Sequence, residues 1–560
     1  MTFMSSQRKN FYAYLSLFLF ALLLRSLYLL EIKDVGAFSL LLGDAKSYAN
    51  WARDISGGNW LGNKVFYQAP MYPYFLAANY FVFGDNPFII RLIQIVFGAT
   101  ACLLIARAGR HFFSNQVGLL SGFILAIYPT AIYFDGIIQK AVLNLFFMTL
   151  LLFLLGKNHR QPSGKLWFAC GLVLACLGLT RENALILAVP IGLWLISRFR
   201  GEDRKKWIVW SCLFFLGLSI VLFPVALRNK IVGGDFALTT AQFGPNFYMG
   251  NHHNASGMYE PLRGGRGSWK YEQQDAVALA EKAVGRNLSP NEVSRYWTQK
   301  TLDEILSNPA DWAYLMGKKW LLFWNFIENS DTESQYAYET WSDILTVLGS
   351  FLHFGVIASL AIFGICITAK DHRQLWLLYL LVMFYSTSVT LFFIFSRYRL
   401  PLVPLLVMFA AAGMVQGILL FRKKRIKALT LSTAIALVSA IIFNWKIIPQ
   451  DQEHFRALSL GNMCTESLVV GKTQQAVEFC LQSLKYDSRK VKILNNLGAA
   501  LIEERRFEEA LPVLQRAVKI NPNLVKARYN IEVAQSQMRA SQTALQHLSD
   551  ARRLKPNGAP

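Results

Sequence analysis

Long apolar stretches recur along the first 445 residues, and they limit the possible folds of this chain more than any other feature. Residues 11–24 carry no charged side chain, and each comparable stretch approaches the roughly 20 residues with which a helix crosses a bilayer. Soluble proteins seldom combine 54% hydrophobic with only 16% charged residues. We therefore expect an all-α, multi-pass membrane protein with about eleven spans, at residues 11–30, 88–106, 117–134, 136–155, 166–180, 183–197, 207–227, 343–368, 374–395, 399–420 and 428–445.

Basic residues gather in every second loop between these spans, which places them on one side of the membrane. Loops rich in Lys and Arg stay in the cytoplasm, so the N-terminus is expected inside and, with an odd number of spans, the C-terminus outside. In a bacterial inner membrane the C-terminal part would be periplasmic. This placement accounts for the net charge of +22 without nucleic acid. The basic clusters are Arg8-Lys9, Arg107–His111, Lys157–Lys165, Arg198–Lys206, Lys370–Arg373 and Arg422–Lys427.

The C-terminal part contains an internal repeat. Ala476, Ala510 and Ala544 are spaced by 34 residues, and the small residues of the middle unit hold the offsets of a tetratricopeptide repeat. We expect a membrane core over residues 1–450 and an α-solenoid of about three repeats over 451–560. Its concave face is expected to bind a protein acceptor or partner, although a purely stabilising cap is the alternative.

The seven cysteines show no metal-site spacing. Five of them lie in predicted spans and are expected to pack there. Cys464 and Cys480 lie in the repeat region, where an oxidising compartment would permit a disulfide, and the sequence leaves this pairing open.

Two outside loops are long, residues 31–87 and 228–342. In the second, Ser289-Pro290 predicts a helix start, with Ser as N-cap and Pro at the first helical position. Residues 309–326 form an aromatic, amphipathic stretch that could lie along the membrane surface.

The first outside loop carries two motifs, Gly43-Asp44-Ala45-Lys46-Ser47-Tyr48 and Tyr67-Gln68-Ala69-Pro70-Met71-Tyr72-Pro73. An acid shortly after the first span, followed by a Pro-x-Tyr-Pro turn into a helix, resembles the GT-C glycosyltransferases of the dolichyl-phosphate-mannose protein mannosyltransferase and aminoarabinose transferase type. Such enzymes take a sugar from a polyprenyl phosphate on the outer face of the membrane. The resemblance covers about residues 11–445, and a known subgroup carries repeat tails.

The resemblance implies that Asp44 is the general base that takes the proton of a hydroxyl acceptor. An exposed loop acid or helix N-cap is the alternative for Asp44. Asp135, in the second outside turn, is a looser match and a second candidate catalytic residue. It could hold a metal, orient the acceptor or stabilise charge, and a simple helix cap is the alternative. Lys140 follows one turn later, where a cation at the centre of a span would cost about 2.5–3.5 kcal/mol.

A lipid-phosphate donor needs cations at the outer interface, and arginine suits phosphate because its planar group donates paired hydrogen bonds. The resemblance covers the Arg-x-Arg-x-Pro motif that begins at Arg397. Structural pairing with neighbouring acids is the alternative for every candidate. The candidates for binding the donor phosphate are Arg25, Arg181, Arg397 and Arg399.

Residues 246–254 form a further candidate substrate loop that includes Asn251. Its paired histidines, His252 and His253, lack a third ligand nearby, so a metal site is the least favoured of three readings, after a substrate loop and a structural turn. Together with Asn251, the other predicted substrate-binding residues are Tyr48, Tyr67, Tyr72 and Lys140.

The sequence therefore predicts a glycosyltransferase that moves a sugar from a polyprenyl-phosphate-linked donor to an extracytoplasmic acceptor. Inversion of the sugar's configuration is implied by the family resemblance alone. The preferred acceptor is a protein hydroxyl, and the alternatives are a glycolipid, a polysaccharide or a non-catalytic scaffold that presents the repeats. A transporter would carry polar groups deep in several spans, and only Lys140 and Arg25 are candidates here. It would often also show an internal duplication, and we see no repeat among the spans. No cofactor is certain, and a divalent metal ion stays open.

Overall fold

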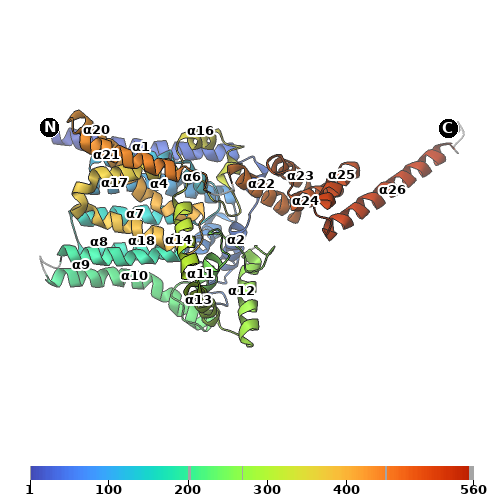
Figure 1. Cartoon of the computed structure of the whole chain (residues 1–560), viewed down its shortest axis with the longest axis horizontal. Helices are drawn as coiled ribbons and strands as arrows, with labels where there is room; N and C mark the ends of the chain where they lie inside the picture. The colour runs from blue at the N-terminus through green and yellow to red at the C-terminus, as the bar shows by residue number, and fades with distance from the viewer. Residues whose placement is uncertain (1, 200–203, 268, 448–450, 554–560) are drawn as a thin grey trace. The chain divides into compact units, whose positions relative to one another are not determined.

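The computed structural model describes residues 2–199, 204–267, 269–447 and 451–553, and every regular element in these ranges is a helix (Figure 1). The prediction of an all-α chain is confirmed. The chain divides into two compact units. The membrane unit comprises Met1–Lys33, Gly43–Asn329 and Trp341–Pro449, and the repeat unit comprises Asp34–Leu42, Ser330–Thr340 and Gln450–Pro560. The expected boundary at residue 450 falls at 448–450, outside the described ranges.

The membrane unit contains several long apolar helices, so a multi-pass membrane protein is confirmed. By length and composition, eight described segments could cross a bilayer. A ninth would be α5 (Asn115–Ala126) joined to α6 (Pro129–Asp135) through a bend of 60°. The eight are Arg8–Ile32, Pro87–Phe112, Ala141–Arg160, Glu182–Phe199, Lys205–Gly233, Phe354–Thr390, Ser396–Arg422 and Ile426–Phe443.

The count is therefore eight or nine where about eleven were expected, for three local reasons. The predicted span 166–180 is helix α8 (Gly164–Thr180), which has only 17 residues. The predicted span 374–395 continues from the preceding helix without a break in helical structure, as the segment Phe354–Thr390. The bend between α5 and α6 falls at Pro129, whose missing N–H and ring do not fit a helix interior.

Close helix packing in the membrane unit depends on small residues. Gly171 of α8 and Gly217 of α10 (Arg204–Gly233) lie at the contact between these two helices. A Cβ on Gly171 would lie 2.0 Å from the carbonyl oxygen of Phe214, and one on Gly217 would lie 2.2 Å from that of Phe168. Glycine thus lets the two backbones touch, which replaces the hydrophobic driving force that lipid does not supply.

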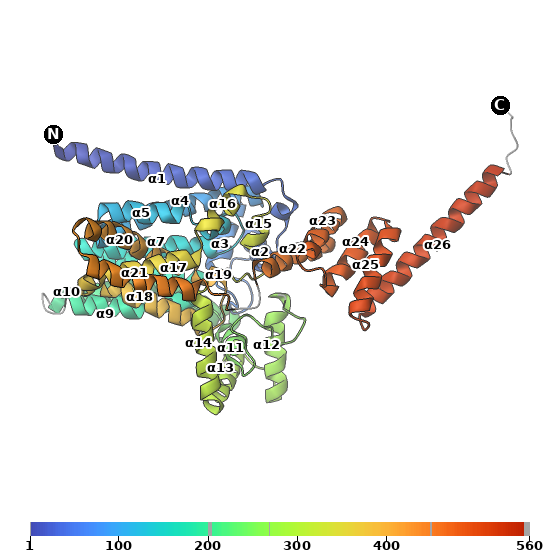
Figure 2. The same ribbon diagram turned by 45° about the horizontal axis from the view of Figure 1, so that its top comes forward.

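One end of the membrane unit gathers several of the basic turns. Helix α1 (Thr2–Ile32) runs along α4 (Pro87–Phe112) and α5 (Figure 2), and the hydroxyl of Tyr14 donates to Asn115 at 2.8 Å. Arg160 at the end of α7 (Ala141–Arg160) donates to the His111 carbonyl at 2.7 Å. Arg198 donates to the His159 carbonyl at 3.1 Å. Of the predicted cluster 198–206, residues 200–203 lie outside the described ranges.

The two long loops of the membrane unit are themselves helical. The first contributes α2 (Asp44–Ser56) and α3 (Met71–Phe83). The second contributes α11 (Phe243–Asn251), α12 (Trp269–Val284), α13 (Pro290–Ser307) and α14 (Pro309–Trp324). Ser289 caps α13 as predicted, and Glu292 completes a capping box.

The C-terminal part of the repeat unit contains two helical hairpins and one long helix. The hairpins are α22 (Gln452–Val469) with α23 (Thr473–Tyr486), and α24 (Val491–Glu503) with α25 (Phe507–Ile520). The expected third repeat is different, because α26 is one unbroken helix over Val525–Arg553. The two hairpins turn at left-handed residues, Gly471 (φ 74°) and Arg505 (φ 58°), whereas α26 continues as a helix through the corresponding position, Arg539.

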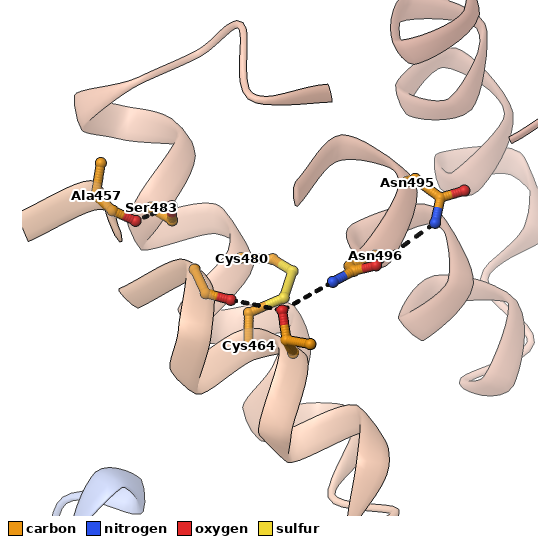
Figure 3. Close-up of a disulfide and its surroundings, with 8 residues drawn as sticks. Ala457, Cys464, Cys480, Ser483, Asn495 and Asn496 are labelled. Carbon is orange, nitrogen blue, oxygen red and sulfur yellow. Dashed lines mark hydrogen bonds between the residues drawn. A yellow bond between two sulfur atoms is a disulfide. The ribbon is translucent and has the colours of Figure 1, made fainter. Parts of the chain in front are cut away.

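The first hairpin of the repeat unit is closed by a disulfide between Cys464 of α22 and Cys480 of α23 (Figure 3). Their Cα atoms are 5.1 Å apart, inside the range that a disulfide requires. The sequence left this pairing open. Of the five cysteines expected to pack in the spans, Cys102 and Cys170 are buried, whereas Cys212 is exposed on α10.

Candidate functional site

Asp44 is the first residue of α2, and its carboxylate is held by two side chains from distant parts of the membrane unit. Its Oδ2 accepts from Nη1 of Arg397 at 2.5 Å, and its Oδ1 accepts from Nε2 of Gln68 at 3.1 Å. Gly43, with φ at 49°, makes the turn that starts the helix. A carboxylate in this first turn is also favoured by the helix dipole. The Asp44 side chain remains 15% exposed, so the carboxylate is held in place and still reachable.

The electrostatics keep this carboxylate ionised. Burial raises the pKa of Asp44, but the charge and hydrogen bond of Arg397 outweigh burial and hold the pKa below its usual range. The charge of Lys140 and the hydrogen bond from Gln68 act in the same direction. Asp44 is therefore a proton acceptor at neutral pH, and it is ready to act as a base.

Cations surround Asp44. Arg397 belongs to α19 (Ser396–Arg399), and Lys140 directly precedes α7. Arg181, at the end of α8, stacks its guanidinium 3.5 Å above the Tyr398 ring, and its Nε has no hydrogen-bond partner among the described residues. Arg397 approaches the same ring, with its Nη2 3.5 Å from the Tyr398 hydroxyl. The charge of Glu182 also acts on Lys140, so three cations lie near two carboxylates. One excess positive charge remains, which suits an anionic group such as phosphate.

Arg25 and Asp135 form a separate pair. Their side chains are fully buried, and Nε of Arg25 lies 2.6 Å from Oδ2 of Asp135. Arg25 also donates to the Ala126 carbonyl at 3.1 Å. Gly98 makes room for the pair, because a Cβ there would lie 1.9 Å from the Asp135 carboxylate. The structure thus brings these two predicted site residues to each other, and no hydrogen bond or ion pair in the described ranges links them to Asp44.

Arg399 is also used inside the membrane unit. It is 1% exposed, and it forms an ion pair with Glu328 at 2.9 Å. The Tyr128 hydroxyl donates to Glu328 at 3.2 Å. Of the two arginines in the Arg-x-Arg motif, only Arg397 contacts Asp44. The further hydrogen bonds of Arg399 go to the carbonyl groups of Phe323, Asn325 and Ile327.

The predicted tyrosines occupy different positions. Tyr48 lies one helical turn after Asp44, is fully buried, and has a hydroxyl without a hydrogen-bond partner among the described residues. Its ring packs edge-on against that of Tyr72, with centroids 5.5 Å apart. Tyr72 donates its hydroxyl to Gln94 at 2.6 Å. Tyr67 is directed to the second long loop, where it donates to Glu272 at 3.2 Å.

Asn251 ties three parts of the membrane unit together. Its Nδ2 donates to the Phe247 and Leu391 carbonyls, both at 2.8 Å. Its Oδ1 accepts from Nε1 of Trp312 at 3.0 Å and from Nζ of Lys319 at 2.9 Å. Burial lowers the pKa of Lys319 to about 7. The polar atoms of Asn251 are therefore committed to holding α14 against α11.

A cavity of about 300 Å³ adjoins Asn251, and its lining does not include Asp44. His252 and His253, which line it, lean toward different acids: His252 Nε2 lies 3.7 Å from Glu260, and His253 Nδ1 lies 3.8 Å from Glu304. Among the residues that the structure describes, no three His, Cys, Asp or Glu side chains are arranged to hold a metal ion.

Sequence reasoning missed several residues of this region. Gln68, which positions Asp44, lies within the second motif of the first long loop, but the sequence assigned it no role. Glu328 and Glu272 belong to no motif. Both are acids of the long loop 228–342, and they pair with Arg399 and Tyr67, for which the sequence indicated no partner. Tyr398 lies between the two arginines of the motif. An aromatic ring with cations on both sides in the sequence could have indicated cation–π contacts at this position.

Comparison with known families identifies the class. Residues 67–227 match the family model described as dolichyl-phosphate-mannose-protein mannosyltransferase, and residues 491–524 match that of the tetratricopeptide repeat. The chain therefore carries a GT-C glycosyltransferase domain followed by a tetratricopeptide repeat, and this part of the prediction is confirmed.

Individual relatives are distant or short. The peroxisomal targeting signal receptor of Candida glabrata is 36% identical over 73 residues, which are 13% of this chain and 12% of that protein. The oligosaccharyltransferase of Archaeoglobus fulgidus in its apo form matches with 13% identity over 82% of this chain and 59% of that one, at a TM-score of 0.44. ArnT from Cupriavidus metallidurans bound to undecaprenyl phosphate matches with 13% identity over 92% of this chain and 76% of that one, at a TM-score of 0.41.

Proposed function

We propose that this chain transfers a sugar from a polyprenyl-phosphate-linked donor to an acceptor on the extracytoplasmic face, and that the acceptor is a protein hydroxyl. The observation that carries the proposal is the ionised carboxylate of Asp44 among Arg397, Arg181 and Lys140. A base next to an anion-binding group is what transfer from a sugar phosphate to a hydroxyl requires.

In the proposed reaction, the arginines and Lys140 hold the donor phosphate. The acceptor hydroxyl attacks the anomeric carbon of the sugar while Asp44 takes its proton. The bond from that carbon to the phosphate oxygen breaks, and the lipid phosphate leaves with the electron pair. Arg181 supports this step because its Nε has no hydrogen-bond partner among the described residues. Attack opposite the leaving phosphate inverts the configuration, in keeping with the family.

Arg397 has two tasks in this scheme. Without substrate it pairs with Asp44 at 2.5 Å. When the donor phosphate arrives, the guanidinium is shared between phosphate and carboxylate, because its planar group offers several donors. Weaker pairing raises the proton affinity of Asp44 at the moment when a base is needed.

We assign the other predicted site residues to architecture. Arg25 with Asp135 fixes α1 against the turn after α6, and Arg399 with Glu328 fixes the end of the second long loop. Asn251 holds α14. Tyr48 and Lys140 remain substrate-binding candidates, since both lie near Asp44.

The proposed topology has the N-terminus in the cytoplasm of a bacterium and the repeats in the periplasm. Basic turns at one end of the membrane unit support a cytoplasmic end. The Cys464–Cys480 disulfide supports an oxidising compartment for the repeats. Eleven crossings would follow if the bent pair α5–α6 forms one span, if α8 spans the membrane, and if α17 (Phe354–Thr368) and α18 (His372–Thr390) cross separately at the basic turn 370–373. The repeats would then hold a protein acceptor or a partner.

The test is transfer of a labelled sugar from a polyprenyl phosphate by the full chain in membranes. Asp44→Asn should lose at least about a hundredfold in rate, the lower end expected for removing a general base. Asp54→Asn removes a carboxylate from the exposed side of the same helix and serves as the matched control with an unchanged rate. Equal rates for Asp44→Asn and the parent chain would overturn the mechanism.

The acceptor class is tested separately. Mass spectrometry of envelope proteins, glycolipids and polysaccharides is compared between cells with the parent chain and cells with Asp44→Asn. A protein acceptor predicts the loss of a sugar from Ser or Thr of one or more proteins. A change confined to lipid or polysaccharide would replace the protein acceptor, and no change in any fraction, with both chains present, would favour a scaffold.

A further inference from the structure

The repeat unit holds a piece of its own chain. Residues 330–340, which lie between two segments of the membrane unit in the sequence, belong to the repeat unit and pack on α22. One face of α22 binds the backbone of this segment at three successive points. Nδ2 of Asn462 donates to the Thr332 carbonyl at 3.0 Å, Oγ of Ser459 accepts from the Ser334 N–H at 3.1 Å, and Nε of Arg456 donates to the Tyr336 carbonyl at 2.6 Å.

This face of α22 also binds an acidic side chain of the segment. Arg456 forms an ion pair with Glu339 of the bound segment at 3.1 Å, with both side chains largely buried. Burial raises the pKa of Glu339 while Arg456 lowers it. The segment itself is acidic, with Asp331, Glu333 and Glu339 and no basic residue between 330 and 340. The first repeat therefore combines backbone recognition by an asparagine with recognition of a carboxylate by a cation.

The same two residue types recur one repeat later. Asn462 and Asn496 are 34 residues apart, as are Arg456 and Lys490, and 34 is the repeat length. Equivalent positions of stacked repeats line one continuous face. In the third repeat, Asn530 keeps the asparagine position, but Leu524 takes the position of the cation. The complete pair thus recurs once, on α24.

In the second pair, the cation makes no hydrogen bond within the described residues. The Lys490 ammonium is buried and has no hydrogen-bond partner among the described residues. Burial lowers the pKa of Lys490, and the charge of Asp487 only partly offsets this. Asn496 donates to Oγ1 of Thr465 at 3.0 Å (Figure 3), which fixes its orientation and leaves one amide N–H to donate. Lys492, the second residue of α24, adds an exposed positive charge.

We propose that the face of α24 formed by Lys490 and Asn496 binds an acidic segment of a separate protein, in the way that Arg456 and Asn462 bind residues 332–339. The carboxylate pairs with Lys490, and the Asn496 amide donates to a backbone carbonyl nearby. This binding rests on the proposed role of the repeats as a dock for a protein, and it requires neither the donor lipid nor Asp44.

The probe is a fluorescent synthetic peptide with the sequence of residues 330–340, added to the purified full chain in detergent. The tethered copy occupies α22, so the added peptide should bind at α24 with one site per chain. The double variant Lys490→Ala with Asn496→Ala should weaken binding at least tenfold. A peptide with its three acids changed to the corresponding amides should weaken binding similarly, because charge-assisted hydrogen bonds are lost.

Lys485→Ala is the matched control, because it removes a lysine from the exposed part of α23. It should leave peptide binding unchanged, and thermal unfolding of each variant checks that the repeats remain folded. No saturable binding, or equal binding by the double variant, overturns the proposal. Binding lost in Arg456→Ala but kept in the double variant also overturns it, since the peptide would then have displaced the tethered segment. Sugar transfer by the parent chain distinguishes this failure from failure of the proposed enzyme activity.

Discussion

Two carboxylate–arginine pairs of the membrane unit have almost the same geometry and very different surroundings. Asp44 and Arg397 are 2.5 Å apart with side chains 15% and 11% exposed, whereas Asp135 and Arg25 are 2.6 Å apart and fully enclosed. The distance between the two charged groups therefore does not distinguish a functional ion pair from a structural one. Access to substrate does, together with the charge of Lys140, which acts on Asp44 in addition to that of Arg397.

The enclosed pair should be the larger contributor to stability. Asp135→Ala leaves the Arg25 charge buried and unpaired, which typically costs about 3–5 kcal/mol of unfolding free energy. Asp44→Ala should cost much less, because solvent reaches Arg397. Thermal unfolding of both variants in the same detergent measures the difference. A melting temperature that falls as much for Asp44→Ala as for Asp135→Ala would break the comparison.

The two arginines of the Arg-x-Arg motif should divide in the same way. Arg397→Lys should weaken binding of the polyprenyl phosphate about tenfold, because lysine cannot serve carboxylate and phosphate together with a planar group. Arg399→Lys should instead lower the melting temperature, because the planar guanidinium of Arg399 bonds several carbonyl groups and Glu328 at once and lysine cannot. Titration with the lipid phosphate and unfolding are measured on each. Weaker lipid binding in Arg399→Lys, with Arg397→Lys unaffected, would exchange their assignments.

The smallest expected effect is on the pH dependence of transfer. The pKa of Asp44 lies below its usual range because of Arg397, so the base stays deprotonated as pH falls until that lowered pKa is reached. The stability from this pair is likewise present above the unfolded pKa and lost as pH falls through the folded one. Arg397→Gln should move the acid limb of the rate profile to higher pH, by about one unit. An acid limb that moves to lower pH, or not at all, would exclude Asp44 as the titrating group.

Much of this architecture was readable from the sequence because it depends on local patterns. Apolar length predicted the helices of the membrane unit, and the 34-residue period predicted the first two hairpins. Ser289-Pro290 predicted a helix start because capping involves only neighbouring residues. The third repeat did not follow. Its small residues recur, but α26 continues through the position where the second hairpin turns at Arg505, and neither stretch contains a glycine or proline that would have distinguished them.

The site was readable only in part, because its pairings join residues far apart in the chain. Asp44 and Arg397 are separated by 353 residues, and no local pattern tells which of Arg397 and Arg399 faces the carboxylate. Arg25 and Asp135 were predicted as site residues because a charged side chain in an apolar helix needs either a function or an ion-pair partner. In the folded chain they are each other's partner. Only the folded chain distinguishes these two cases.

The most direct test of the central claim measures single-turnover sugar transfer by Asp44→Asn and Asp135→Asn side by side, each corrected for its folded fraction. The account predicts that Asp44→Asn binds the lipid donor and unfolds normally but transfers at least about a hundredfold more slowly. It predicts that the folded fraction of Asp135→Asn transfers at nearly the parental rate. A normal rate in Asp44→Asn with a lost rate in folded Asp135→Asn would contradict it and move the base to the enclosed pair.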